Sequence, residues 1–226
     1  MILKSSENLF NSVTVTSAGI EAQICKFSLT FSQTRNGKTE WRLKLPVFTR
    51  SFHKYIKAKN SVPSQNDYWI FYTCENKEYL SGLNLSQEEK TGVKARVFRA
   101  YPSLVRDFHF GLYIKEKNIF KTVFYNEILD IEYGIDLVVE NAAGEKTGLI
   151  FFTKTKAAEH ARNVKKLRPK KKAGFVCHEI PIDFCGSKVC GDFFLYSERE
   201  INTIMEKISP GQFPPVFSSW KGPFPL

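Results

Sequence analysis

Hydrophobic positions in the second half of the chain change from a helical to an extended spacing. After Pro102, apolar residues recur every three or four positions, which predicts a helix with proline in its first turn. Apolar runs rich in β-branched and aromatic residues follow. They predict three strands, at residues 119–125, 128–139 and 148–153.

A second helix is predicted at residues 156–168, where small apolar side chains share one face and charged side chains occupy the others. Two more strands are predicted at 175–184 and 189–197. Isoleucine and methionine side chains then form the apolar stripe of a closing helix, at Ile201, Ile204, Met205 and Ile208. The order helix, three strands, helix, two strands, helix indicates an α/β fold with a mixed central sheet flanked by helices.

The first hundred residues show a different pattern. Segments 22–34 and 39–48 are rich in β-branched and aromatic residues and flank "RNGK", and Asn-Gly between two such runs is a strong hairpin signal. A further strand is predicted at 68–74, and "NLSQEEK" contains the capping-box pattern of a short helix. A small β-rich N-terminal module is therefore expected.

These patterns divide the chain into three parts. We predict a β-rich module at 1–98, an α/β domain at 99–208 and an extended arm at 209–226. The arm holds five prolines and should not be helical. It also carries large aromatic side chains, so it is expected to pack back on the domain or to meet a partner protein. These side chains are Phe213, Phe217, Trp220 and Phe224.

Composition and charge favour a folded protein with a polyanionic partner. The chain is 42% hydrophobic, which is enough for a packed core, and it lacks an apolar run of about 18 residues or a secretory signal, so a cytoplasmic location is expected. The net charge of +10 favours DNA, because lysine and arginine release counterions from phosphates; simple solubility is the alternative. The predicted DNA-binding residues are Arg162, Lys165, Lys166, Arg168, Lys170, Lys171 and Lys172.

The five cysteines are odd in number and follow no spacing pattern, which favours free thiols in a reducing compartment and no disulfide. A zinc site is the alternative considered for the second half of the chain. Its ligand spacing does not match paired zinc knuckles. The residues concerned are Cys177, His178, Cys185 and Cys190.

Two charged residues interrupt apolar runs in the predicted sheet. Asp136 lies in the second run, and Lys154 ends the third. Magnesium-dependent hydrolysis of a phosphodiester needs carboxylate oxygens on the metal and a cation near the developing charge. An acid and a lysine on adjacent strands therefore suggest a metal-dependent nuclease. There are two alternative interpretations. Asp136 could cap a turn after Gly134. Lys154 could be a solvated charge on a sheet edge.

The order of these elements, with "GID" opening the second strand and "FFTKT" ending the third before a helix, resembles the restriction-endonuclease-like PD-(D/E)XK superfamily over about residues 101 to 200. The resemblance implies an endonuclease of the restriction, repair or transposition type that uses Mg²⁺ or Mn²⁺. It assigns Asp136 to the metal-binding aspartate, Lys154 to the motif lysine and Asp107, on the preceding helix, to the accessory carboxylate and second metal ligand.

The chain departs from the superfamily at Phe152, where the superfamily has Glu or Asp. Glu159 on the following helix and Glu132 before the second strand are the candidates for a migrated acid, and Glu159 is included among the predicted catalytic residues. The alternative is a nuclease fold without cleavage. The chain would then be a subunit that binds nucleic acid, or a protein partner through its N-terminal module or C-terminal arm.

Overall fold

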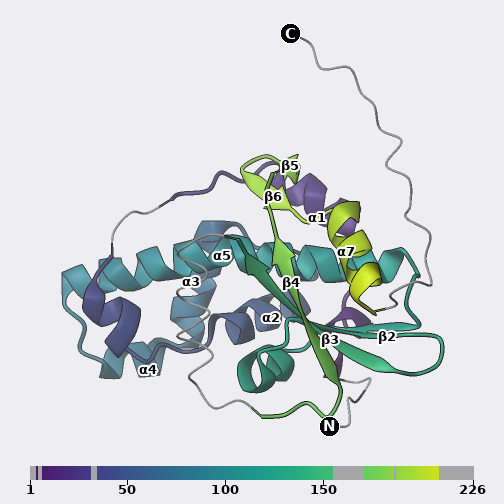
Figure 1. The fold of residues 1–226 in the computed structure, drawn as a ribbon. Helices are drawn as coiled ribbons and strands as arrows, with labels where there is room; N and C mark the ends of the chain where they lie inside the picture. Colours follow the sequence, from purple (N-terminus) through teal and green to yellow (C-terminus); the bar gives the residue numbers. More distant parts are fainter. Residues whose placement is uncertain (1–3, 5–6, 32–34, 155–170, 186, 209–226) are drawn as a thin grey trace.

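The computed structural model describes most of the chain. The described residues are 4, 7–31, 35–154, 171–185 and 187–208. Figure 1 shows two regions joined by one long helix, α5: the helices α2, α3 and α4 gather around its first half, and a sheet lies across its second half. The structure is mixed helix and sheet, in agreement with the predicted α/β class.

The described residues before α5 are helical, so the predicted β-rich N-terminal module is wrong. No described residue in this part belongs to a strand. Its helical segments are η2 (Leu9–Asn11), α1 (Ser17–Ile24), η3 (Lys38–Arg42), α2 (Phe48–Lys59), α3 (Gln65–Glu75) and α4 (Lys77–Gly82).

The predicted hairpin is replaced by a helix start. The side-chain oxygen of Asn36 accepts hydrogen bonds from the backbone N–H groups of Lys38 (3.0 Å) and Thr39 (3.2 Å). An asparagine that binds the first free N–H groups of a helix acts as a cap. The Asn-Gly pair therefore begins η3 and does not close a hairpin.

The predicted strand at 68–74 is part of α3. Tyr68 and Tyr72 are both fully buried, whereas Ile70 between them is 58% exposed. In a strand, all three side chains would share one face, because side chains alternate with a period of two. Burial of the two tyrosines against the long helix, with Tyr68 5.9 Å from Tyr101 between ring centroids, selects the helical spacing.

The long helix α5 (Gln87–Glu116) begins at the predicted capping box. Ser86 Oγ accepts a hydrogen bond from Glu89 N (3.2 Å), and Glu89 Oε2 accepts one from Ser86 N (2.9 Å), so this prediction is confirmed. The helix was predicted to be short, but α5 is long. It continues through the predicted boundary between residues 98 and 99, and the largest cluster of core side chains includes residues from both sides of that boundary.

The sequence predicted Pro102 in the first turn of a new helix. In the structure it lies inside α5. Proline has no N–H to donate to the carbonyl oxygen of residue 98, which would normally end a helix or bend it. That carbonyl, on Phe98, accepts a hydrogen bond from Gln65 Nε2 (3.1 Å) on α3 instead. A tertiary contact therefore satisfies the group that proline leaves free.

The main sheet confirms most of the predicted strands. Its order is β1-β2-β3-β4; β1–β2 and β2–β3 are antiparallel, and β3–β4 is parallel. The second predicted strand is too long, because residues 129–133 form a π-helical turn that Gly134 ends at φ +66°. The predicted helix at 156–168 lies outside the described residues. The elements are β1 (Thr122–Phe124), η4 (Leu129–Tyr133), β2 (Leu137–Glu140), β3 (Lys146–Thr153) and β4 (Val176–Ile182).

The last described elements are a small hairpin and the predicted closing helix. The segment expected to be one strand forms β5 (Lys188–Cys190) and β6 (Phe193–Leu195), because Gly191 turns the chain at φ +57°. The closing helix α7 (Glu198–Ile208) is confirmed, with Ile201 and Ile204 buried.

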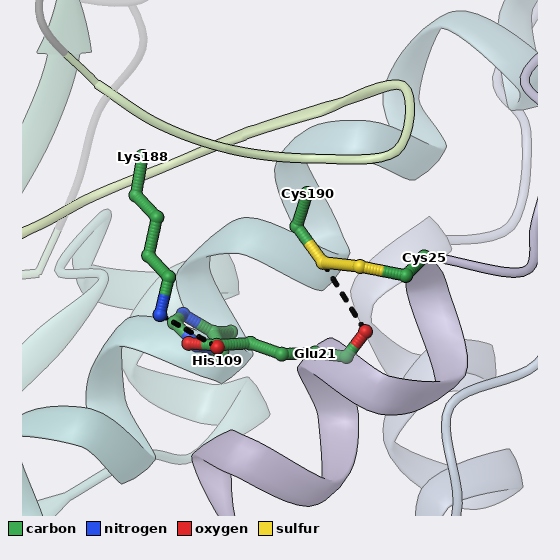
Figure 2. The surroundings of a disulfide bond; sticks show 5 residues. All are labelled: Glu21, Cys25, His109, Lys188 and Cys190. Carbon is green, nitrogen blue, oxygen red and sulfur yellow. Dashed lines mark hydrogen bonds and ion pairs between the residues drawn. A yellow bond between two sulfur atoms is a disulfide. The ribbon is translucent and has the colours of Figure 1, made fainter.

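The hairpin is tied to α1 by a disulfide between Cys25 and Cys190, which makes the prediction of free thiols wrong for this pair (Figure 2). The two residues are 165 positions apart in sequence, yet their Cα atoms lie 5.2 Å apart. Beside the disulfide, Glu21 contacts His109 Nε2 at 3.0 Å and Lys188 Nζ at 2.6 Å. Burial lowers the pKa of His109 below its ordinary value.

Candidate active site

Asp136 lies immediately before β2, at the end of the sheet where β1 and β3 finish. Its backbone N–H donates to Leu149 O (3.0 Å), and its Oδ2 accepts a hydrogen bond from the backbone N–H of Phe151 (2.7 Å). The side chain is half-buried. Asp136 is therefore held against β3 by one backbone and one side-chain hydrogen bond, at the start of the second strand.

Asp107 lies on the middle part of α5 and is also half-buried. Its Oδ1 accepts a hydrogen bond from the hydroxyl of Tyr196 (3.3 Å), the residue that follows β6. The Tyr196 ring packs between Phe110 (5.1 Å between centroids) and Phe151 (5.5 Å). Tyr196 thus connects the Asp107 carboxylate to the same part of β3 that binds Asp136.

Two buried phenols report the electrostatics of this region. Burial raises the pKa of Tyr196 well above its ordinary value, and the Asp107 and Asp136 carboxylates raise it further, while Arg106 acts against them. Burial also raises the pKa of Tyr125, which follows β1, and three carboxylates add to the effect: Asp107, Asp130 and Asp136. The carboxylates of Asp107 and Asp136 therefore both act on the same two hydroxyl groups.

Asp130 is the residue that the sequence analysis missed. It lies on η4, is half-buried, and its Oδ2 accepts a hydrogen bond from Thr49 Oγ1 on α2 (2.5 Å). Glu132, which was considered as the migrated acid, instead forms a side-chain ion pair with Lys171, and its backbone carbonyl oxygen accepts a hydrogen bond from the backbone N–H of Lys171. Both acids stand in the same short stretch of sequence, and their tertiary contacts distinguish them: Asp130 binds Thr49, whereas Glu132 pairs with Lys171.

Lys154 directly follows β3 and is exposed. Its backbone N–H donates to Ile182 O (3.0 Å) at the end of β4, so it lies at the same end of the sheet as Asp136. Within the described part of the chain, the Lys154 ammonium makes no hydrogen bond or ion pair with Asp107 or Asp136. Lys154 therefore lies at the same end of the sheet as Asp136, but its ammonium group does not contact the two acids.

The remaining predicted site residues are described only in part. Lys171 and Lys172 are exposed. Lys171 pairs with Glu132, and this ion pair raises its pKa. The others lie outside the described residues: Glu159, Arg162, Lys165, Lys166, Arg168 and Lys170.

The residues present suit Mg²⁺ in their chemistry. No three acidic, histidine or cysteine side chains of the described residues gather closely enough to hold a metal ion. Mg²⁺ is commonly bound by one or two carboxylates, and waters and substrate phosphates complete its six ligands. Asp107 and Asp136 supply such a pair. The zinc alternative is not supported, because the sulfur of Cys190 is bonded to Cys25.

Comparisons with known proteins do not place the chain in a group. No family model, no curated protein and no solved structure matches it. No helix among the described residues is both long and apolar enough to cross a membrane.

Proposed function

We propose that this chain is a metal-dependent endonuclease that acts on DNA, with its active site at the end of the sheet where β1 and β3 finish. The observation that carries the proposal is that two carboxylates lie beside the same part of β3: Asp136 Oδ2 accepts a hydrogen bond from Phe151 N, and Asp107 Oδ1 accepts one from Tyr196, whose ring packs against Phe151. Two half-buried carboxylates beside one segment of a sheet are candidate ligands for a divalent ion, so this place is a candidate functional site.

The sheet topology supports the same proposal. A helix, an antiparallel three-stranded meander and a parallel fourth strand follow one another in the chain. This order is the basis of the resemblance to the PD-(D/E)XK superfamily. Asp136 before β2 and Lys154 after β3 occupy the two positions that the resemblance assigns to the metal-binding aspartate and the motif lysine.

In this proposal the residues of the chain have separate tasks. Asp107 and Asp136 would hold a divalent ion, and that ion would supply activation of a water molecule and neutralisation of charge on the phosphate. The Tyr196 hydroxyl and the Phe151 N–H orient the two carboxylates. Lys154 is exposed and can move toward a phosphate oxygen. The basic residues 162–172 bind the DNA backbone.

The second candidate function is a subunit that binds nucleic acid without cutting it. Phe152 favours this candidate, because an aromatic ring stands where the superfamily has a metal-binding acid. The absence of a contact between Lys154 and the two carboxylates in the described residues also favours it. Binding to DNA is expected under both candidates, and only cleavage separates them.

The cleavage test compares the parent protein with Asp136→Asn and Lys154→Met on plasmid and branched DNA, in Mg²⁺ and in Mn²⁺. Both substitutions keep the volume of the side chain and remove one charge, so cleavage should be lost while folding and DNA binding persist. Glu78→Gln, an exposed acid on α4, is the matched control. If the parent binds DNA but cuts none in either metal, the non-catalytic function replaces the first. Undiminished cleavage by Asp136→Asn would remove this site from the mechanism.

A further inference from the structure

A pocket lies in the helical region, far from the carboxylates. It is a pocket of about 660 Å³ between α3, α4 and the start of α5. Its lining includes Val93, and α5 rises about 1.5 Å per residue, so this part of the pocket is about 21 Å along the helix from Asp107. The volume is within the usual range of small-molecule sites, which is roughly 300 to 1,000 Å³.

The inner lining of the pocket is apolar. Trp69 from α3, Leu80 from α4, Leu85 and Val93 contribute to it. Val93 is buried, and the other three side chains are half-buried, so their outer surfaces remain in contact with solvent. An aromatic or aliphatic group that enters the pocket would cover this surface, which is a favourable contribution to binding.

The charge of the pocket is positive. Lys77 and Lys90 both line it and are exposed, and the described residues that line it include no acid. Neither lysine forms an ion pair within the described part of the chain. The nearby acids Glu75 and Glu89 are already paired with Lys54 and Lys38. Two lysines without partners at the mouth of an apolar pocket favour an anionic ligand.

Polar groups in the lining limit the chemistry further. The Ser81 hydroxyl and the Asn84 amide also line the pocket, and in the described part of the chain neither has a side-chain hydrogen bond. A fatty acid would leave these groups without partners, which costs free energy when they are covered. A ring that carries carbonyl and N–H groups would satisfy them. The ligand should therefore combine a flat polar ring with an anionic group.

We propose that this pocket binds a nucleotide, with the base against the apolar lining formed by Trp69, Leu80 and Leu85 and the phosphate between Lys77 and Lys90. The base would exchange hydrogen bonds with Ser81 and Asn84. The proposal does not depend on the nuclease function, because neither the carboxylates nor a metal ion contributes to this pocket.

The test is calorimetric titration of the full-length protein in EDTA with thymidine 5′-monophosphate, thymidine, inorganic phosphate and laurate. EDTA removes divalent ions and thus any metal-mediated binding at the carboxylates. The nucleotide should bind about tenfold more tightly than the nucleoside, since a charge-assisted phosphate contact contributes at least about 1.4 kcal/mol. The double substitution Lys77→Gln/Lys90→Gln should abolish this preference. Lys94→Gln is the matched control, because Lys94 is one turn further along α5 and lies over Phe98 outside the pocket.

Several results would overturn the proposal. Inorganic phosphate that binds as tightly as the nucleotide would show a surface anion site without a base pocket. Laurate that binds more tightly than the nucleotide would assign the pocket to an aliphatic anion. No binding of the nucleotide to the parent, or equal binding to the parent and the double variant, would remove the nucleotide from the pocket altogether.

Discussion

Buried tyrosines have different partners in the helical region and in the sheet region. In the helical region their hydroxyl groups donate to backbone carbonyl oxygens: Tyr68 to Phe48 (2.8 Å), Tyr72 to Pro46 (3.0 Å) and Tyr101 to Pro63. In the sheet region Tyr196 donates to the Asp107 carboxylate, and Tyr125 lies in the field of three carboxylates.

The two regions differ in the kind of acceptor that the buried tyrosine hydroxyl groups bind. A phenol that donates to a loop carbonyl satisfies both groups and fixes the loop, so its burial is compensated locally. In the sheet region the acceptor of the Tyr196 hydroxyl is the side-chain carboxylate of Asp107, so this hydrogen bond fixes a charged side chain and not a backbone carbonyl. The helical region therefore uses its tyrosines to hold backbone carbonyl groups, whereas in the sheet region Tyr196 binds a carboxylate of the candidate site.

The disulfide between Cys25 and Cys190 joins α1 to the β5–β6 hairpin, and its reduction should have the largest effect on stability. A crosslink between residues 165 positions apart restricts the unfolded chain, and its loss is expected to lower the free energy of unfolding by as much as about 5 kcal/mol. Urea unfolding with and without a reductant measures this. The double variant Cys25→Ala/Cys190→Ala should not respond to the reductant, and Cys74→Ser, at an exposed free thiol, should respond like the parent. Equal midpoints for oxidised and reduced parent would contradict the prediction.

Gly111 marks the place where α5 meets both the N-terminal segment and the sheet. A Cβ there would lie 2.4 Å from Phe10 Cζ and 3.0 Å from Leu137 Cδ1. Gly111→Ala should therefore destabilise the protein by about 2 kcal/mol, because a packed core resists added volume. Gly82→Ala, where nothing lies within 4 Å, is the control and should be neutral or slightly stabilising. Thermal unfolding measures both variants. A lower unfolding midpoint for Gly82→Ala than for Gly111→Ala would contradict the prediction.

His53 gives the helical region a dependence on pH. Burial lowers its pKa from 6.5 to about 3, and its Nε2 is buried with no hydrogen-bond partner. Below about pH 6.5, His53 binds a proton in the unfolded chain but stays neutral in the folded chain. Stability should therefore be full at neutral pH and fall by about 2 kcal/mol between pH 7.5 and 5 from this residue alone. His53→Gln should flatten the fall in urea titrations, whereas His178→Gln on β4 should not; identical slopes for all three proteins would exclude His53 as the cause.

Removing single hydroxyl groups tests the comparison itself and has the smallest expected effect. Tyr68→Phe should cost about 1 kcal/mol, because it leaves the Phe48 carbonyl without its donor. Tyr125→Phe should cost less, since the Tyr125 hydroxyl has no hydrogen bond among the described residues. Chemical denaturation resolves the difference. A larger loss for Tyr125→Phe would mean that this phenol has a structural role like the tyrosines of the helical region.

The candidate site could be predicted only in outline. Asp136 was expected at the start of the second strand and Lys154 at the end of the third, and the structure places both at one end of the sheet. The parts of the site that surround them could not be read from local patterns. The contact of Asp130 with Thr49 spans 81 positions, and the contact of Asp107 with Tyr196 spans 89. Such contacts depend on how distant elements pack.

The sequence by itself determined the elements whose local signals agree with their surroundings: the capping box at Ser86, the strands β3 and β4, and the apolar stripe of α7. Tertiary structure decided the rest. Aromatic segments in the first hundred residues became helices because their tyrosines are buried against α5, and α5 passes through Pro102 because Gln65 satisfies the Phe98 carbonyl. Periodicity and capping act over a few residues, whereas burial and hydrogen bonding are settled only when distant segments meet.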